Sequence, residues 1–529
     1  MNAVKNGVRT AFIALESLFD RVFGTAGNPL YHTGALGFFF YWIVLVSGVY
    51  VYIFFDTSVS GAYSSVERLT VAQWYAGGVM RSLHRYGSDA LVVVMFVHIL
   101  REFALDRLRG ARWFTWITGI PVLWLVYVAG IGGYWLVWDH LAQYVALTTS
   151  EWLDSLPIFA EPIARNFLDP TALNDRFFTL LVFVHIAVPI IMLFVLWLHL
   201  QRISAPRYNP PRQMALMTLG MLLVLSFLKP ALSHPPADLA TVPSVIRLDW
   251  LYLTVYPLVN SWSALGTWAV VGGFTLLLTL LPWLPPLKRK PAAVVTLDYC
   301  NGCTRCAADC PYNAISMARR SDGKAFEQEA VVDAALCVTC GICVGSCPTA
   351  TPFRTTAELP VGIDLVDQPL RQVRERTQQA ARRCAGADLR VMVFGCDHAV
   401  APAALERHGV AVVGLPCIAM LPPSFIDYVL SRSLADGVFL TGCPESECHN
   451  RLGVTWMAQR LAGQRDPNLR ERVPRERLAT CWAGAVEKHK VNQELDAFIT
   501  RLKPLPRLGP AQLPAAAVAS PETSTEAVS

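Results

Sequence analysis

Four histidines inside apolar segments are the residues of this chain best suited to hold a redox metal. His84 and His98 lie 14 residues apart in one segment, and His185 and His199 lie 14 residues apart in another. Fourteen residues is close to four helical turns, so each pair lies on one face of its helix, about 21 Å apart along the axis. Two such helices can hold two stacked haems, an outer one between His84 and His185 and an inner one, near the cytoplasm, between His98 and His199. Because both axial positions of each iron would be filled, the expected chemistry is electron transfer.

Glycines provide an independent observation. The 14-residue interval recurs between Gly34 and Gly48 and between Gly119 and Gly133. This is expected if each haem edge needs a patch without side chains on two neighbouring helices. The alternative is structural: histidines can bond neighbouring membrane helices, and small residues let helices pack closely. The interval that both residue types share favours a haem pocket.

Cysteines form a second candidate redox site. All 14 lie at or beyond Cys300, and eight fall in two CxxCxxCxxxCP runs that begin at Cys300 and Cys337. This spacing is the bacterial ferredoxin pattern, in which three thiolates of a run hold one [4Fe–4S] cluster and the fourth cysteine crosses to the other cluster. The expected ligands are Cys300, Cys303, Cys306 and Cys347 for one cluster, and Cys337, Cys340, Cys343 and Cys310 for the other. The zinc alternative is weak, because tetrahedral sites need fewer cysteines than these runs supply.

Further cysteines follow three short apolar runs. The runs at 389–395, 410–414 and 437–441 are separated by helix-length segments, which predicts parallel strands of an α/β layer. Ligands at the carboxyl ends of parallel strands converge on one crevice. The expected ligands of a further metal centre there are Cys396, Cys417, Cys443 and Cys448. Cys384 and Cys481 fit no such pattern, and we expect buried structural thiols.

These four histidines lie in an apolar half of the chain, and the cysteines lie in a half with the composition of a soluble protein. The chain has 529 residues, 53% hydrophobic and 16% charged, which is too apolar for an ordinary soluble domain. Six spanning helices are expected, at about 34–55, 76–102, 114–138, 176–202, 213–229 and 262–284. The basic residues between them fall on one side if the N-terminus is cytoplasmic: Lys5, Arg9, Arg107, Arg109, Arg112, Arg202, Arg207, Arg212, Lys288, Arg289 and Lys290. We therefore expect an inner-membrane protein with both termini and the cysteine-rich half in the cytoplasm, without a cleavable signal.

The apolar half resembles a known family. The stretches from Arg81 to Arg101 and from Trp116 to Asp139 look like the cytochrome b subunit of bc-type quinol-oxidising complexes. The resemblance implies that Arg81 and Arg101, each three residues from a histidine, bind haem propionates, and it implies a homodimer through this part. A fixed cation suits a propionate at the membrane edge. For Arg101 the alternative is interfacial anchoring.

The resemblance extends to a quinone site. The segment 234–243, followed by Asp249 and Tyr252, is similar to the family segment that lines the outer quinone site and normally ends in Pro-Glu-Trp-Tyr. Leu248 replaces the proline and Asp249 the glutamate, so the carboxylate side chain is one methylene shorter. The resemblance implies that Asp249 and Tyr252 serve the quinone, with Asp249 accepting a proton. A purely structural segment is the alternative.

The C-terminal cysteines also carry a resemblance. The stretches 415–417 and 436–449 look like the delta subunit of methyl-viologen-reducing hydrogenase, over about residues 388–490. This resemblance implies a [2Fe–2S] cluster and electron passage between a hydrogenase and a heterodisulfide-reductase-type flavoprotein. The chain departs at the first element, where the family tends to have several cysteines and only Cys396 is present.

The expected protein is therefore multi-domain. Its parts are a cytoplasmic segment at 1–33, an all-α transmembrane haem-binding helix bundle at 34–286, an α+β ferredoxin-like domain at 292–356, an α/β domain at 388–490 and a disordered tail at 505–529. We expect an electron-transfer subunit of a quinone-linked oxidoreductase, which connects a cytoplasmic flavoprotein, dehydrogenase, hydrogenase or heterodisulfide-reductase-like partner through one [2Fe–2S] and two [4Fe–4S] clusters to two b haems and quinone. The alternative is a membrane anchor and electron adaptor without quinone chemistry.

Other classes of function fit less well. No Gly-rich phosphate loop follows a strand, so another protein is expected to oxidise the primary substrate. A transporter is disfavoured, because the polar residues inside the apolar segments pair as ligands and do not line a path. No nucleic-acid partner is expected. The sequence leaves the direction of electron flow open.

Overall fold

The chain folds into two compact units, Met1–Arg289 and Lys290–Ser529, here called the N-terminal unit and the C-terminal unit. The computed structural model describes residues 2–511 except 159–161, 164–172, 202–205, 242–244, 285–289, 357 and 486. Several residues used in the sequence predictions lie outside the described residues: Arg202, 242–243, Lys288, Arg289 and 512–529 of the expected tail.

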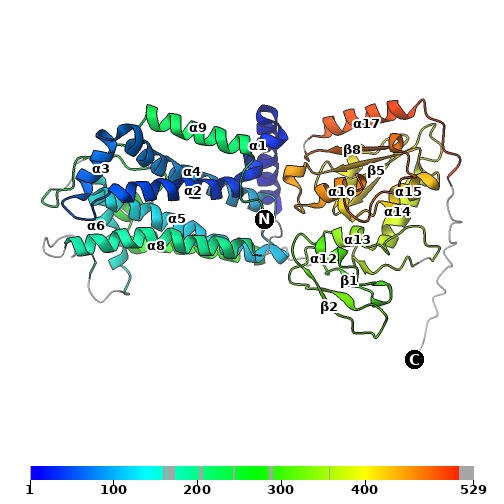
Figure 1. Ribbon diagram of the computed structural model, residues 1–529, viewed down its shortest axis with the longest axis horizontal. Coiled ribbons are helices and arrows are strands. Elements are labelled where there is room, and N and C mark those ends of the chain that lie inside the picture. The colour runs from blue at the N-terminus through cyan, green and yellow to red at the C-terminus, as the bar shows by residue number, and fades with distance from the viewer. Residues whose placement is uncertain are drawn as a thin grey trace. The chain divides into compact units, whose positions relative to one another are not determined.

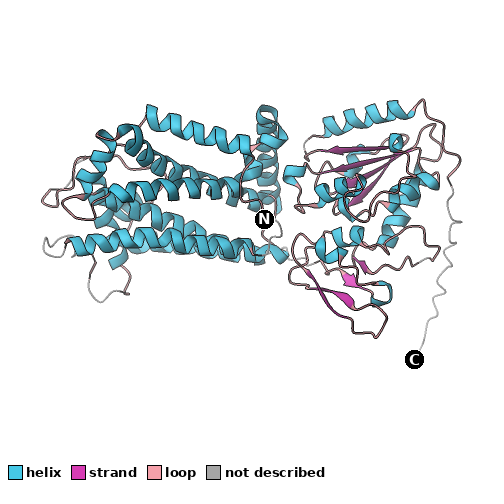
Figure 2. Cartoon of the chain, in the orientation of Figure 1, coloured by secondary structure: helices cyan, strands magenta, loops and turns pink. Residues whose placement is uncertain are grey.

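The N-terminal unit is built from helices (Figures 1 and 2). They are α1 (Asn2–Gly27), α2 (Thr33–Phe54), α3 (Ala62–Val71), α4 (Val79–Ala104), α5 (Trp113–Val137), α6 (His140–Asp154), α8 (Asp175–Leu200), α9 (Arg212–Leu228), α10 (Tyr256–Ser261) and α11 (Ala264–Leu280). The expected cytoplasmic segment is largely the helix α1. Two long pairs dominate the packing, α2 against α4 and α5 against α8.

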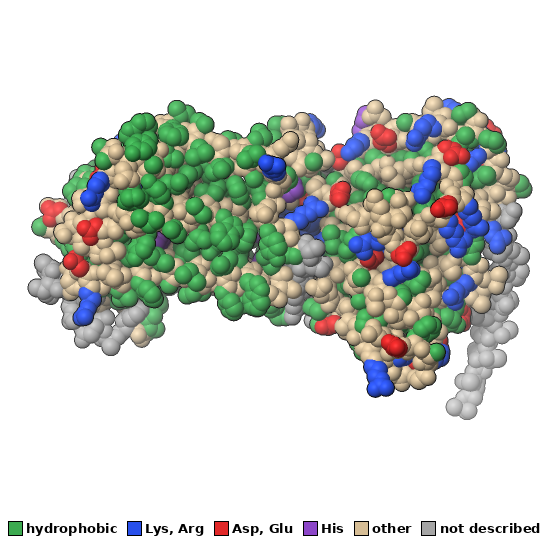
Figure 3. All heavy atoms as spheres, viewed as in Figure 1, with side chains coloured by type: hydrophobic (Ala, Val, Ile, Leu, Met, Phe, Trp, Pro, Cys, Tyr) green, Lys and Arg blue, Asp and Glu red, His purple; other side chains and the backbone are tan. Residues whose placement is uncertain are grey.

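Four segments are long and apolar enough to cross a membrane: Pro29–Phe54, Trp113–Val137, Asp175–Leu200 and Ala264–Trp283. The helix α9 is apolar but shorter, and α4 carries ionisable residues such as Arg85 and Asp89. A helical N-terminal region with apolar spans is thus confirmed, and the count of six spans stays a prediction. Figure 3 shows mostly hydrophobic side chains over this unit, whereas charged ones gather on the C-terminal unit. Broad exposed apolar surfaces of this kind suit contact with lipid.

The C-terminal unit combines small antiparallel sheets with a parallel sheet (Figure 2). Its ferredoxin-like part contains β1 (Val294–Val295), α12 (Arg305–Ala308), β2 (Ile315–Arg319), β3 (Gln328–Val332), α13 (Ile342–Ser346) and β4 (Ile363–Asp364). Its α/β part contains α14 (Leu370–Arg383), β5 (Val391–Cys396), β6 (Val410–Leu415), α15 (Ser424–Ser431), β7 (Gly437–Gly442), α16 (Gly453–Leu461), β8 (Leu478–Trp482) and α17 (Lys488–Leu502).

The α/β part has helices on both faces of its sheet. The strand order is β6-β5-β7-β8, and every neighbouring pair is parallel. Alternate residues of β5 face opposite sides, as in any strand: Met392 and Phe394 join a core that includes α14 and α15, whereas Val391 and Val393 join a core with α17. The three predicted strands are present and parallel, and β8 was not predicted. The larger core also contains ferredoxin-like residues such as Ile342, so the two parts pack as one body.

Candidate functional site

The first predicted histidine pair faces two of the predicted glycines. His84 lies on α4 beside α2, and a methyl group added at Gly48 would lie 2.8 Å from its Cε1. His185 lies on α8 beside α5, and a methyl group at Gly133 would lie 3.0 Å from its Cε1. The two imidazole centroids are 6.2 Å apart, with an interplanar angle of 71°. A metal held about 2 Å from one nitrogen of each ring puts the centroids about 6 Å apart, so this pair fits a bis-imidazole iron.

The second histidine pair repeats the arrangement with more space. A methyl group at Gly34 would lie 3.6 Å from Cε1 of His98, and one at Gly119 would lie 3.3 Å from Cε1 of His199. All four predicted glycines therefore lie against a predicted ligand, each on the helix that packs beside it. A larger residue at Gly48 or Gly133 would press on an imidazole, because side chains in packed interiors have little free space, whereas Gly34 leaves room for a methyl group.

Backbone carbonyls orient the first pair. His84 Nδ1 lies 2.9 Å from the carbonyl oxygen of Val44, and His185 Nδ1 lies 3.0 Å from that of Ala129. A carbonyl can only accept, so Nδ1 carries the proton in each ring. The lone pair of Nε2 is then free for a metal, which is the usual arrangement of a metal-ligating histidine.

Threonine hydroxyls orient the second pair. His98 Nδ1 lies 3.2 Å from Oγ1 of Thr33, and His199 Nδ1 lies 3.1 Å from Oγ1 of Thr118. The Thr118 hydroxyl donates its own hydrogen to the carbonyl of Phe114 at 2.9 Å. It therefore accepts from Nδ1 and again leaves Nε2 of His199 available. Sequence reasoning missed both threonines, although each directly precedes a predicted glycine.

The two predicted propionate arginines have carboxylate partners within the protein. Arg81 pairs with Glu67 of α3 at 3.3 Å and donates to Ser233 Oγ at 2.7 Å. Arg101 is buried and pairs with Glu16 of α1 at 2.9 Å. Both arginines lie about one turn from a predicted ligand, which is close enough to reach a propionate. Because each already has a carboxylate partner, their role toward a propionate stays a prediction. The Glu16 contact fixes α1 against the end of α4.

The candidate quinone carboxylate is fully engaged. Oδ1 of Asp249 accepts the backbone N–H groups of Leu251 and Tyr252, at 2.6 and 2.8 Å. Oδ2 accepts from the Tyr134 hydroxyl at 2.8 Å and pairs with the Arg85 guanidinium. The Asp249 side chain is 7% exposed. Sequence reasoning missed Arg85, although an ionisable residue in a predicted membrane helix is a functional candidate by itself.

Tyr252 is buried beside this carboxylate. Its hydroxyl lies 2.5 Å from Ser88 Oγ on α4. A methyl group at Gly130 of α5 would lie 2.1 Å from a ring carbon of Tyr252, so only glycine leaves room for the ring. The structure thus brings Asp249 and Tyr252 to the same place between α4 and α5.

The first predicted cluster site surrounds open space. A small pocket is lined by all four predicted ligands, Cys300, Cys303, Cys306 and Cys347. Burial raises the pKa of Cys306 to about 12, and the neighbouring Cys347 adds to this. A free thiol there would be protonated, whereas coordination to iron favours the thiolate. The cavity and donor set fit a [4Fe–4S] cluster.

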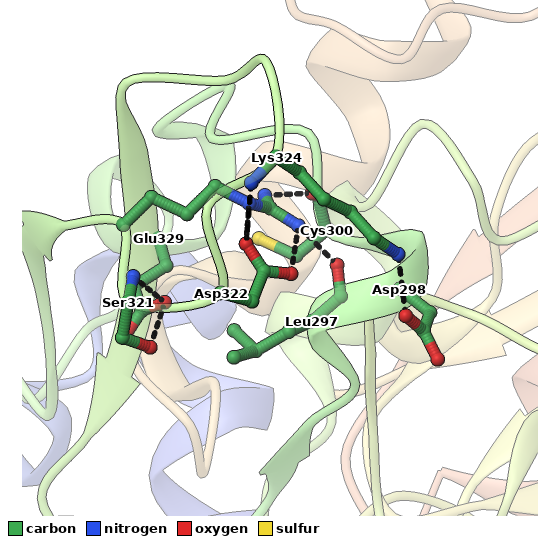
Figure 4. A network of polar contacts seen from close by, with 8 residues as sticks. Leu297, Asp298, Cys300, Ser321, Asp322, Lys324 and Glu329 are labelled. Atoms are coloured by element: carbon green, nitrogen blue, oxygen red, sulfur yellow. Dashed lines mark hydrogen bonds and ion pairs between the residues drawn. The ribbon is translucent and has the colours of Figure 1, made fainter.

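The loop of Cys300 is held by polar contacts (Figure 4). Arg320 donates to the carbonyl oxygens of Cys300 and Leu297, both at 2.6 Å. Lys324 pairs with Asp298 at 2.5 Å on the outside of the same loop. These contacts fix the backbone from which the first ligand projects.

The second predicted cluster site includes Cys343 of α13 and Cys340, which lies just before that helix. Burial raises the pKa of Cys340 to about 12, and the charges of Cys310 and Cys337 raise it further. Burial also raises the pKa of Cys343, with added contributions from cysteines of both predicted sets, including Cys306. Cys310 is thus close to the second run, as the crossed pattern requires.

The four C-terminal cysteines converge at the carboxyl ends of the parallel strands. Cys396 Sγ, at the end of β5, lies 4.0 Å from Cys443 Sγ, just after β7. A methyl group at Gly453 would lie 2.4 Å from Cys417 Sγ and 3.5 Å from Cys448 Sγ. The strands β5 and β6, which are consecutive in the sequence, pair with each other, and β7 pairs with the other edge of β5. Open α/β sheets bind ligands in the crevice that forms at the carboxyl ends of strands where the strand order reverses in this way.

The remaining cysteines lie elsewhere. Cys384 follows α14, and Cys481 lies on β8, where it packs with Val491 in the core beneath α17. Burial raises the pKa of each thiol. In the part of the chain that the structure describes, no group of three or more His, Cys, Asp or Glu side chains is placed to hold a single metal ion.

Comparisons with known proteins match three parts of the chain. The family Cytochrome b/b6/petB matches residues 20–205, the 4Fe-4S dicluster domain matches residues 299–351, and the delta subunit of methyl-viologen-reducing hydrogenase matches residues 390–506. All three sequence resemblances are confirmed. The first match implies haem b and the second implies a [4Fe–4S] cluster, and together they support a membrane electron-transfer subunit.

Individual relatives agree with the cytochrome b-like part. Cytochrome b of Rhodospirillum rubrum is 23% identical over 298 residues, which cover 50% of this chain and 72% of that protein. Cytochrome b of Rickettsia prowazekii (strain Madrid E) is 25% identical over 295 residues, with 50% and 73% covered. A solved chain of "Hyperthermophilic respiratory Complex III" is 20% identical with a TM-score of 0.40, over 49% of this chain and 77% of that chain.

Proposed function

We propose that this protein carries electrons between a cytoplasmic redox partner and membrane quinone. The centres of the proposed path are one [2Fe–2S] cluster, two [4Fe–4S] clusters and two b haems, in that order from the cytoplasm. The partner is a flavoprotein, dehydrogenase, hydrogenase or heterodisulfide-reductase-like protein. Each bound centre would exchange single electrons, and the protein residues hold the centres, exclude water and orient the ligands.

The observation that carries the haem assignment is the common environment of the four histidines. Each imidazole has its Nδ1 bonded to an oxygen and its Cε1 against a glycine of the neighbouring helix. Packing alone explains a buried histidine, but it does not require the same two contacts four times. Filling both axial positions of each iron would exclude oxygen and favour electron transfer.

The quinone link is proposed at Asp249 and Tyr252. Arg85 connects Asp249 to Asp89, with which it also forms an ion pair. A proton delivered to Asp249 would therefore reach a chain of ion pairs that continues through Arg85 to Asp89 on α4. Ionisable residues within membrane helices mark such proton paths more often than they mark packing.

One observation favours the second candidate, an adaptor without quinone chemistry. Both oxygens of Asp249 already accept hydrogen bonds, including two from the backbone. A carboxylate that accepts several hydrogen bonds holds its charge and is a poor proton acceptor. On this alternative, Asp249 orders the loop before α10, and quinone reacts on another subunit.

Haem reduction by a quinol analogue separates the two candidates. We expect that decylubiquinol reduces the haems of the purified full-length protein, and that a quinone-site inhibitor blocks this reduction. Asp249→Asn should slow haem reduction by at least tenfold while the haem content stays the same. The matched control is Asp238→Asn, which changes an exposed carboxylate of the same loop.

Two results would contradict parts of the proposal. If dithionite reduces the haems but the quinol does not, the quinone link is rejected and the adaptor function is the one that remains. Full-length protein without the absorbance bands of bis-imidazole haem would remove the membrane part of the electron path altogether.

A further inference from the structure

The C-terminal unit contains a fully buried arginine, Arg460, which is not a predicted cluster ligand. Arg460 lies on α16. Its Nη2 lies 2.5 Å from Oδ2 of Asp309 and 2.6 Å from Oγ of Ser346, and its Nη1 donates to the carbonyl of Ala419 at 2.8 Å. Arg465, which is partly exposed, also pairs with Asp309. Burying a charged side chain costs desolvation free energy that its partners must offset, so the partners of Arg460 indicate which parts of the fold it holds together.

Each partner of Arg460 adjoins a different predicted cluster. Asp309 directly precedes Cys310, Ser346 directly precedes Cys347, and Ala419 lies two residues after Cys417. One guanidinium thus bonds to the loops of the two [4Fe–4S] sites and of the C-terminal four-cysteine site.

The loops meet closely around this cation. A methyl group at Gly345 of α13 would lie 1.9 Å from the carbonyl oxygen of Ala419 and 2.8 Å from Nη1 of Arg460. A methyl group at Gly453, at the start of α16, would touch both Cys417 Sγ at 2.4 Å and Ile342 Cδ1 at 3.6 Å. The four-cysteine site is therefore packed directly against the ferredoxin-like helix.

Charge at this position acts on the redox centres. A cluster gains one negative charge when it is reduced, and a nearby buried cation stabilises that charge strongly because the local dielectric is low. The Nε–H of Arg460 is also buried and has no acceptor among the described residues.

We propose that Arg460 is a positioning residue that joins the three iron–sulfur sites into one path, by fixing their loops against each other and by raising the reduction potential of the C-terminal cluster. This inference rests on the proposed function, because it requires that the cysteines hold clusters. Asp309 has the opposite effect on the reduction potential of the C-terminal cluster, because its negative charge offsets the positive charge of Arg460.

The test is a redox titration of the purified full-length protein, followed by electron paramagnetic resonance. Arg460→Gln should lower the ratio of reduced to oxidised C-terminal cluster at a fixed potential by about tenfold, equivalent to about 59 mV for one electron. Asp309→Asn should move the ratio in the opposite direction. Arg460→Lys, which keeps the charge, should stay closer to the unsubstituted protein than Arg460→Gln does.

The chain provides a matched control. Arg390 and Asp436 form another buried ion pair, at 3.1 Å, before the amino ends of β5 and β7. Six strand residues, roughly 20 Å, separate Arg390 from the end of β5. Arg390→Gln should weaken folding as Arg460→Gln does, yet change the reduced fraction by less than twofold.

The outcomes are distinguishable. Three results would overturn the inference and leave the proposed function intact. The first is an equal shift in Arg460→Gln and Arg390→Gln, and the second is no shift in either variant. The third is a shift of Asp309→Asn in the same direction as that of Arg460→Gln. If Arg460→Gln does not fold, the direction of the Asp309→Asn shift decides. Absence of cluster signals and of bound iron from the unsubstituted protein would overturn the cluster assignments and this inference with them.

Discussion

The two units position their candidate redox ligands by different means. In the N-terminal unit, both ligands of a pair come from regular helices, and the 14-residue interval alone puts His84 and His98 on one face of α4. In the C-terminal unit, the ligands project from loops and strand ends, such as Cys396 and Cys443, which are 47 residues apart yet have sulfurs at 4.0 Å.

This difference implies different responses to damage. A helix whose hydrogen bonds are internal keeps its shape when one side chain is lost. A loop that depends on several packed neighbours does not, because its ligands, core and ion pairs support each other. We therefore expect loss of a histidine to remain local, and loss of a C-terminal cysteine to spread through the unit.

The largest effect is expected from Cys417→Ser. It should abolish the C-terminal cluster signal and lower the free energy of unfolding of the C-terminal unit, because the binding energy of a metal centre is part of the folding energy. Thermal unfolding of the full-length protein, together with iron content per chain, measures both effects. The matched control is Cys481→Ser, which also buries a hydroxyl, at about 1–3 kcal/mol, but should keep the cluster. Equal iron content in the two variants would contradict the ligand assignment.

The next effect is expected from His185→Ala. The variant should lose one of two haems and keep the other, because His98 and His199 lie on separate turns of the same rigid helices. Haem per chain, from the pyridine haemochrome spectrum, should fall from two to one, while the iron–sulfur signals stay unchanged. His140→Ala, at the start of α6, is a control without a predicted ligand role. Loss of both haems would mean that the two sites are not independent.

The smallest effect is expected from substituting the glycines beside the imidazoles, and it should differ between the two histidine pairs. Gly48→Ala places a methyl group 2.8 Å from His84 Cε1, whereas Gly34→Ala places one 3.6 Å from His98 Cε1. The first contact is too close and should cost about 1–3 kcal/mol, as overpacking does, and the second is ordinary contact. Haem content after dilution should therefore fall several-fold in Gly48→Ala and stay near normal in Gly34→Ala. The opposite ranking would show that the pocket around the first pair is not rigid.

The sequence was sufficient wherever chemistry followed a fixed interval. The histidine and glycine intervals predicted which helix faces meet, and the structure places all four glycines against the four imidazoles. The CxxCxxCxxxCP runs similarly predicted the crossed set in which Cys347 lines the same cavity as Cys300. Helix periodicity and tight cysteine loops are local geometries that a short stretch of sequence specifies, so these side chains could be placed near one another from their spacing, while their roles as ligands stay predictions.

Tertiary structure alone decided the contacts between distant segments. Nothing near Arg460 in the sequence indicates that it bonds to the loops of Asp309, Ser346 and Ala419, since these lie between 41 and 151 residues away. The same holds for Arg85 with Asp249, which are 164 residues apart. Pairings of this kind depend on which elements pack together and on the low dielectric of the interior, in which an unpaired buried charge is costly. The spacing of residues along the chain specifies neither of these.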